Sequence, residues 1–299
     1  MKRYLAFLLA AVLALSGCQG QSGNSSTSSQ SLPTVSGSLP HSAHPEVLAV
    51  LETLRIVDGA EDGLLVLAGK EASELYTLNV DQIPVFLDEK EADPSVLEDG
   101  MMAEVSYGGD IVTSWPAQLG GVQSISVHSL GSQKNPGGTT YDLCGLYLQV
   151  LNDLWEKDSG LNSGLRYISV DLDSAPGALT EGEKAAIAWI FAGQHNAQPL
   201  NLNQDELAAE GYLTAQSLMV CGEDTQSSEH TLYTWEDGLL FSITAEPQGE
   251  MEHYSLPVVK FDAQKWRTPL GAYYFSDCSA LWPQMGSWSS YEIGAEMIS

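Results

Sequence analysis

The chain has 299 residues, 43% of which are hydrophobic, and carries a formal net charge of −27. A surface this acidic repels the phosphates of DNA and RNA, which argues against nucleic-acid binding. It also repels anionic lipid headgroups, so the folded part is expected to stand off a membrane surface. The length is sufficient for one large domain or two ordinary ones.

The first residues have the pattern of an export signal. Lys2 and Arg3 precede an apolar run at positions 5–15, which is shorter than the ~20 residues of a membrane-spanning helix. Small residues then lead into the tetrad Leu15-Ser16-Gly17-Cys18. This tetrad resembles the lipobox of bacterial lipoproteins, which implies a cleaved signal peptide at 1–17 and lipid attachment at Cys18. The alternative is a plain secretory signal with an incidental cysteine.

The segment after the cysteine has the composition of a flexible tether. Positions 19–45 contain no Lys, Arg, Asp or Glu and are rich in Ser, Gly, Gln, Asn and Thr. Such a segment buries too little apolar surface to fold. We therefore expect residues 18–45 to connect acyl chains such as palmitate to a folded body. The membrane, contacted through these chains at its extracytoplasmic face, is the expected partner and location.

Residues 46–130 are expected to form a small β module. "GLLVLAG" at 63–69 and "ELYTLNV" at 74–80 are apolar runs bounded by turn residues. "MMAEVSYGGDIVTSW" at 101–115 alternates and contains Gly108-Gly109, which predicts a hairpin. "GGVQSISVHSL" at 120–130 predicts a last strand. The stretch 47–57 fits either a helix or a strand.

Several short strands in so few residues favour a small barrel. The stretch "EDGMMAEVSYGGDIVTSWPAQLGGVQSISV" at 98–127 resembles the YobA-like domains of Gram-positive lipoproteins. This resemblance implies an OB-like β-barrel and assigns no activity. An OB-like face that binds nucleic acid carries basic and aromatic residues, and this stretch is acidic.

Residues 131–140, "GSQKNPGGTT", are the expected linker to a second domain at 141–299. Helical spacing of apolar residues predicts helices at 141–158, 179–195 and 203–213. Thr180 and Glu183 form the reciprocal capping pair S/T-x-x-E at the start of the second helix. "LRYISVDLD" at 165–173 predicts a strand between the first two helices.

A run of strands is predicted from residue 217 onward, with a hairpin turn at Glu236-Asp237-Gly238. Helices followed by strands are typical of an α+β domain whose helices pack on a mainly antiparallel sheet. The expected fold class is therefore α+β, with a small OB-like β-barrel preceding this domain. "FDAQKWRTPLGAYYFSDC" at 261–278 and "EIGAEMIS" at 292–299 resemble the C-terminal regions of uncharacterised clostridial surface lipoproteins, which implies no particular chemistry.

The cysteines leave the disulfide question open. Besides Cys18 the chain contains Cys144, Cys221 and Cys278, which allow at most one internal disulfide in any of three pairings. An oxidising location favours a bridge, and buried thiols are the alternative. The absence of a C-x-x-C pair argues against structural zinc, so no metal site is predicted.

Asp171 and Asp173 begin like a calcium-binding EF-hand loop. The match then fails, because Pro176 stands where the loop needs Gly and Gly182 stands where it needs Glu. We expect these carboxylates to face solvent or the N-terminus of the following helix, whose dipole favours them. An irregular cation site is the alternative.

No nucleophile elbow, P-loop or dinucleotide-binding motif occurs in the sequence. Cys221 or Cys278 with His230 or His253 is the combination available for a Cys-His pair. No catalytic residue and no cofactor are predicted. Aromatic residues between 266 and 291 either fill a core or stack on a sugar or peptide ligand.

The preferred interpretation is a lipid-anchored cell-surface protein that binds a partner without catalysis. Its protein or glycan partner and its ligand-binding residues are not identified by the sequence. The alternatives are a cell-envelope hydrolase whose site is assembled in space, and a regulatory component of an envelope-sensing system.

Overall fold

The computed structural model describes residues 49–60, 63–129, 142–221, 227–245, 258–281 and 291–299 of the chain. The side chains of residues 219–221 and 227–229 are outside this description. Cys18, the expected tether at 18–45 and the expected linker at 131–140 also lie outside the described residues. In the described part of the chain, no helix has both the length and the hydrophobicity needed to cross a bilayer.

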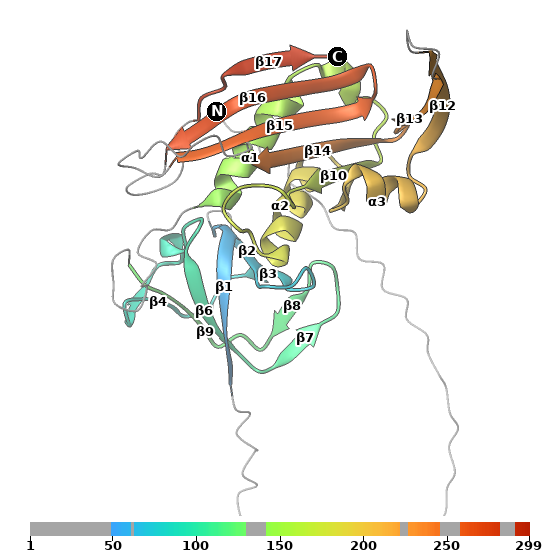
Figure 1. Ribbon diagram of the computed structural model, residues 1–299. Coiled ribbons are helices and arrows are strands. Elements are labelled where there is room, and N and C mark those ends of the chain that lie inside the picture. The colour runs from blue at the N-terminus through green and yellow to red at the C-terminus, as the bar shows by residue number, and fades with distance from the viewer. Residues whose placement is uncertain (1–48, 61–62, 130–141, 222–226, 246–257, 282–290) are drawn as a thin grey trace, which may run out of the picture. The chain divides into compact units, whose positions relative to one another are not determined.

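The first half of the described chain forms a seven-stranded sheet with the order β3-β2-β1-β6-β9-β4-β5 (Figure 1). Strands β4 and β9 run parallel, and the other neighbours are antiparallel. Strands β7 and β8 form a separate ribbon. The bounds are β1 Val50–Asp58, β2 Leu64–Ala68, β3 Leu75–Asn79, β4 Val85–Leu87, β5 Lys90–Ala92, β6 Met102–Tyr107, β7 Asp110–Val112, β8 Gln118–Gly120 and β9 Ser124–Val127, with a 3-10 helix at Pro94–Val96.

Of the ambiguous stretch 47–57, residues 50–57 form part of strand β1, which pairs along β6 with Thr53 opposite Glu104. Alternation in β6 is confirmed: Ala103, Val105 and Tyr107 are buried, and the residues between them are half-buried. This period of two is what a sheet with one face in the core requires.

The expected closed OB-like barrel is wrong. A barrel needs its terminal strands to share hydrogen bonds. In the described residues the edge strands β3 and β5 do not pair with each other; an isolated bridge instead joins Tyr76 of β3 to Ala117, just before β8. The expected hairpin around Gly108-Gly109 is also wrong. The turn exists, with Gly109 at φ +88°, but β6 pairs with β1 and β9, and β7 pairs with β8.

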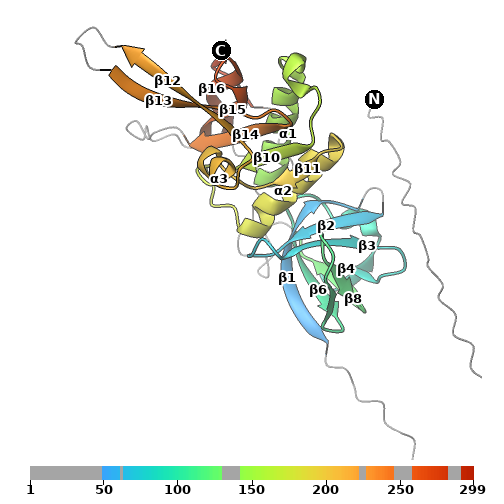
Figure 2. The same ribbon diagram turned by 90° about the vertical axis from the view of Figure 1, so that its right-hand side faces the viewer.

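The second half contains a six-stranded sheet with the order β11-β10-β14-β15-β16-β17. Strand β10 is parallel to both β11 and β14, and the remaining pairs are antiparallel. A separate ribbon, β12–β13, extends beyond this sheet (Figure 2). The bounds are β10 Tyr167–Asp171, β11 Gln198–Leu200, β12 Thr214–Cys221, β13 Ser227–Thr234, β14 Gly238–Ala245, β15 Val258–Thr268, β16 Gly271–Leu281 and β17 Ala295–Ile298.

Three α-helices lie in the described part of the chain, namely α1 Leu143–Glu156, α2 Glu181–Gln194 and α3 Gln204–Ala209, with a 3-10 helix at Ser159–Asn162. The capping pair at the start of α2 is confirmed: Glu183 N donates to Thr180 Oγ1 at 3.1 Å, and Thr180 N donates to Glu183 Oε2 at 2.8 Å. Helices α1 and α2 cover one face of the second sheet and share its main core.

Helix α2 also packs on the first sheet. The main core contains Val57, Val66 and Leu75 of the first sheet together with residues of α1 and α2. We call this contact the seam. At the seam Thr180 Oγ1 donates to the carbonyl of Gly69 at 2.7 Å, and a Cβ added to Gly182 would lie 2.5 Å from the same oxygen. Val47–Ser299 therefore form one compact unit.

The expected α+β class is wrong as well. Strands make up 46% of the described structure and helices 20%, so this part of the protein is mostly β. The second sheet is mixed, because the chain passes from β10 through α2 to β11, and β14 then joins β10 in parallel. The expected hairpin at Glu236-Asp237-Gly238 is wrong, since β13 pairs with β12 whereas β14 pairs with β10 and β15.

Candidate functional site

The second sheet has a covered face and an open face. Phe241, Ile243 and Phe275 point to the covered face and belong to the main core under α1 and α2. Side chains alternate along a strand, so the residues between them point the other way. The open face is therefore formed by a second, polar set of residues on the same strands.

The polar residues of the open face are aligned across the strands by their register. Asp171 of β10 is opposite Ser242 of β14, Ser242 is opposite Gln264 of β15, and Gln264 is opposite Tyr274 of β16. The next row begins with Thr244 opposite Asp262. All six side chains are half-buried.

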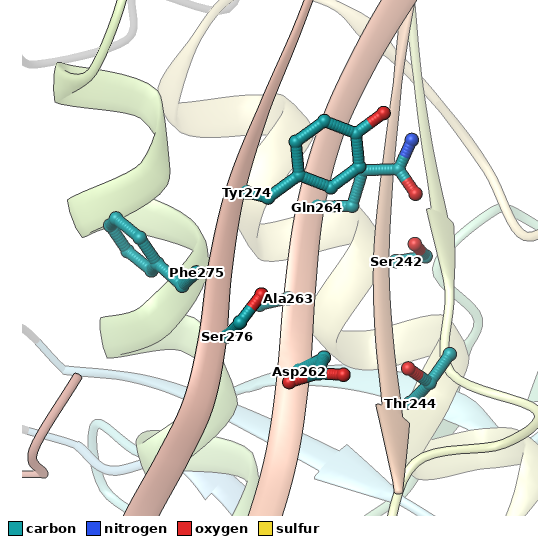
Figure 3. Close-up of a pocket in the computed structure, with 8 residues that line it drawn as sticks. All are labelled: Ser242, Thr244, Asp262, Ala263, Gln264, Tyr274, Phe275 and Ser276. Atoms are coloured by element: carbon teal, nitrogen blue, oxygen red, sulfur yellow. The ribbon is translucent and has the colours of Figure 1, made fainter. Parts of the chain in front are cut away.

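A hollow of about 180 Å³ lies among these residues. Figure 3 shows the hydroxyls of Ser242, Thr244 and Ser276 with the Asp262 carboxylate on one side of the sheet, and the Phe275 ring turned away toward a helix. Figure 3 also places the Tyr274 ring and the Gln264 amide together at one end. The lining consists of Ser242, Thr244, Asp262, Ala263, Gln264, Tyr274, Phe275 and Ser276.

A β-bulge positions the carboxylate of the hollow. The register of β15 and β16 shifts between Phe261, which pairs with Cys278, and Ala263, which pairs with Phe275. Asp277 sits in the bulge at φ +55°, and its N–H donates to Asp262 Oδ1 at 2.9 Å. A bulge re-aims neighbouring side chains and is common beside functional sites. A carboxylate has about four lone-pair sites, so this bond leaves Asp262 able to accept more donors.

One end of the open face is closed by a small apolar cluster, which we call the aromatic cluster. Tyr274 packs against it and thus connects it to the hollow. The residues of the aromatic cluster fill a core. Of the residues that form this cluster or pack against it, Tyr274 is the one that also lines the hollow. The buried members are Leu207, Trp235, Leu240, Trp266 and Ala272.

Asp171 and Asp173, the sequence candidates for a cation site, do not line the hollow. Asp173 N donates to Asp171 Oδ1 at 3.1 Å, and Lys184 Nζ donates to Asp173 Oδ1 at 2.7 Å. Burial raises the pKa of Asp171 above its ordinary value, and the nearby Asp173 and Glu206 act in the same direction. Among the residues that the structure describes, no group of three His, Cys, Asp or Glu is arranged to hold a metal ion.

The candidate Cys-His pair is not assembled by the residues that are described. Cys278 is fully buried on the covered face, whereas His230 is exposed on β13. The Cys221 side chain and His253 lie outside the described residues. Cys144 is buried in the main core, and burial raises the pKa of its thiol, which makes it a poor nucleophile.

A second polar group lies on the covered face and was not expected from the sequence. Lys265 is 0% exposed, and its ammonium donates to the carbonyls of Trp155, Lys157 and Asp158 at 3.2, 2.6 and 3.3 Å. Burial lowers the pKa of Lys265 to about 8. Its three donors are all engaged at the C-terminal end of α1, so it ties that end to the sheet.

Arg267, two residues further along β15, also connects the sheet to other segments by donating to backbone carbonyls. Its guanidinium donates to the carbonyls of Trp235, Leu161, Ser163 and Glu236. The sequence indicates neither role, because the bonded carbonyls belong to segments that are far away in the chain.

The residues of the hollow belong to an alternating pattern in the sequence and to no short catalytic or binding motif. In "LLFSITAE" a polar residue recurs at every second position between apolar ones, and in "FDAQKW" Asp262 and Gln264 are two positions apart, on either side of Ala263. This pattern identifies one polar face on each of the two strands. It does not show which face of the sheet the helices leave uncovered.

No protein-family model matches the chain, and no curated protein matches it.

Proposed function

We propose that this protein is a lipid-anchored, non-catalytic binding protein on the extracytoplasmic face of the cell membrane, and that the open face of the second sheet is its binding surface. The hollow on that face carries the proposal, because half-buried hydroxyl, amide and carboxylate groups from three strands converge there. Ligand sites orient their ligands through a few placed polar groups in a concave surface, and the hollow supplies such groups.

The lining favours binding over hydrolysis. Asp262 is the only carboxylate among the eight lining residues, and none of them is His, Cys or Lys. Glycoside hydrolysis commonly uses two carboxylates, and nucleophilic hydrolysis needs a base within hydrogen-bond reach of the nucleophile. The hollow has a single carboxylate, and among the described residues Asp262 is hydrogen-bonded to the Asp277 N–H and to none of the hydroxyls that line the hollow.

The tetrad ending in Cys18 supports the anchoring part of the proposal. Mass spectrometry of the mature N-terminus and membrane fractionation test it with Cys18→Ser. We expect acylation and membrane retention in the native protein and the loss of both in the variant. An unmodified N-terminus, or membrane retention of Cys18→Ser, would contradict the anchor.

The binding part is tested on glycan and peptide arrays. Ser276→Trp places a large ring in the hollow, and Ser126→Trp makes the same change on strand β9 of the first sheet, where the side chain is likewise half-buried. We expect Ser276→Trp to abolish the array signal and Ser126→Trp to leave it. Equal signals from both variants would refute this binding surface.

A further inference from the structure

Resting on the proposed binding function, we propose that the hollow takes a positively charged group, an ammonium or a guanidinium, carried by a larger extracellular ligand. The hollow contains the acceptors and the ring that such a group requires, and its own charge is negative. An anionic ligand meets no cation among the lining residues.

Charge complementarity is the first support. Asp262 places a carboxylate in the hollow, and Asp171 adds another on the same face, in register with Ser242. The net charge of −27 adds a field of the same sign. Cations are drawn to such a surface, and anions are kept from it.

The nearest cations of β15 do not neutralise the hollow. Lys265 and Arg267 alternate onto the covered face, where backbone carbonyls engage them. Lys260 shares the open face with Asp262, but it is exposed and does not line the hollow. Asp262 thus faces the hollow with its charge available to a ligand.

The uncharged lining also fits a cation. An ammonium has three donors and no acceptor. The Asp262 carboxylate, the Gln264 carbonyl and the hydroxyl oxygens of Ser242, Thr244 and Ser276 supply acceptors around one space (Figure 3). The Tyr274 ring at one end offers a cation–π contact.

The size of the hollow limits what enters it. Sites that enclose a whole small molecule measure ~300–1,000 Å³, whereas this hollow measures about 180 Å³. It therefore accommodates one end group, such as a lysine or arginine side chain, while the rest of the ligand lies outside.

Isothermal titration calorimetry tests this inference on the full-length protein in zwitterionic nanodiscs at physiological salt. The probes are acetyl-Gly-Lys-Gly-amide, the same peptide with norleucine in place of lysine, and neutral tetra-N-acetylchitotetraose, hereafter chitotetraose. The variants are Asp262→Asn and Glu91→Gln. Both remove one negative charge, but Glu91 is exposed on β5 of the first sheet. Asp262→Asn keeps an oxygen for the Asp277 N–H and should fold.

We expect the lysine peptide to bind and the norleucine peptide not to bind. Asp262→Asn should weaken lysine-peptide binding about tenfold, whereas Glu91→Gln changes it less than about twofold. Tyr274→Phe should retain binding, and Tyr274→Leu should lose part of it, because the first keeps the ring.

If Asp262→Asn and Glu91→Gln weakened lysine-peptide binding equally, the inference would be overturned. The net negative charge of the whole protein, rather than Asp262, would then account for the binding. Binding of chitotetraose that Ser276→Trp abolishes, without binding of the lysine peptide, would overturn the cation inference and leave the proposed function standing. If a probe bound the native protein and the Ser276→Trp variant equally well, both the cation inference and the proposed binding surface would be overturned.

Discussion

Arg55 of the first sheet and Glu183 of α2 form an ion pair with 2.9 Å between Nε and Oε1, although 128 positions separate them in the sequence. The same guanidinium donates to the carbonyl of Gly100 at 2.6 Å. Glu183 is 7% exposed and also accepts the Thr180 N–H in the capping pair. One carboxylate therefore caps α2 and holds it against the first sheet.

Replacing Arg55 with Met should destabilise the protein by about 2 kcal/mol, because it leaves a buried carboxylate without its cation. Adding Glu183→Gln should restore part of the loss, since a glutamine can still complete the capping pair. Urea unfolding measures both free energies. A double variant as unstable as the sum of the single variants would show that the two residues are not coupled.

Gly182→Ala should destabilise the protein by about 1–3 kcal/mol, because the added Cβ would lie 2.5 Å from the backbone oxygen of Gly69. Helix propensity alone predicts the opposite sign. Gly193→Ala in the same helix is the matched control, since nothing lies within 4 Å of its added Cβ. It should be neutral or stabilising by up to about 1 kcal/mol. The thermal unfolding temperatures of the two variants test whether Gly182 packs tightly against the backbone of Gly69 at the seam.

Asp142 predicts a pH dependence of stability. It is 4% exposed at the N-cap of α1, where it accepts the Gly145 N–H at 2.8 Å, and burial raises its pKa to about 6. The folded state therefore binds a proton more readily than the unfolded state, whose pKa is near 3.9. The stabilisation that comes from the raised pKa of Asp142 is fully present below pH ~3.9, the pKa in the unfolded state, and it is lost as the pH rises through about 6, the pKa in the folded state.

Asp142→Asn should remove this dependence and stabilise the protein by about 1–3 kcal/mol at pH 7, because asparagine caps a helix as well as aspartate does. Asp142→Ala loses the cap and serves as the control. Unfolding free energies measured from pH 4 to pH 8 test the sign. A native protein whose stability, relative to Asp142→Asn, rises over that range would contradict it.

Two lysines should respond differently to the same replacement. Lys265→Met leaves three carbonyls near the end of α1 without their buried donor and should cost about 3 kcal/mol. Lys157→Met breaks an exposed pair with Glu296, 2.8 Å long, and should change stability by less than about 1 kcal/mol. Chemical denaturation compares them directly. If the two variants lost the same free energy of unfolding, the buried hydrogen bonds of Lys265 would not be what stabilises the C-terminal end of α1.

Local features of the fold were predictable from the sequence, and strand partners were not. The helices at α1 and α2 and the capping pair of Thr180 and Glu183 follow from apolar spacing and short-range hydrogen bonds, which lie within one segment. Gly109 likewise marks a turn. Whether the strands on either side of that turn pair with each other depends on competition from β1, which comes from another part of the chain.

The candidate site follows the same division. Ser242, Thr244, Asp262 and Gln264 alternate with apolar residues, so their shared orientation is readable from the sequence. Their convergence depends on the β15–β16 bulge and on helices covering the opposite face. Both are results of long-range register and packing, which a single sequence does not display.

Helix α2 contacts both sheets, so Val57, Val66 and Leu75 of the first sheet would lose their apolar neighbours without the second half, although the first sheet also has a core of its own. Cutting the backbone between residues 131 and 140 should yield a nicked but still associated particle rather than two independent proteins. Heating should likewise melt the protein in one step. The first sheet then supports the second sheet through α2, and removing it should disturb the open face that we propose as the binding surface.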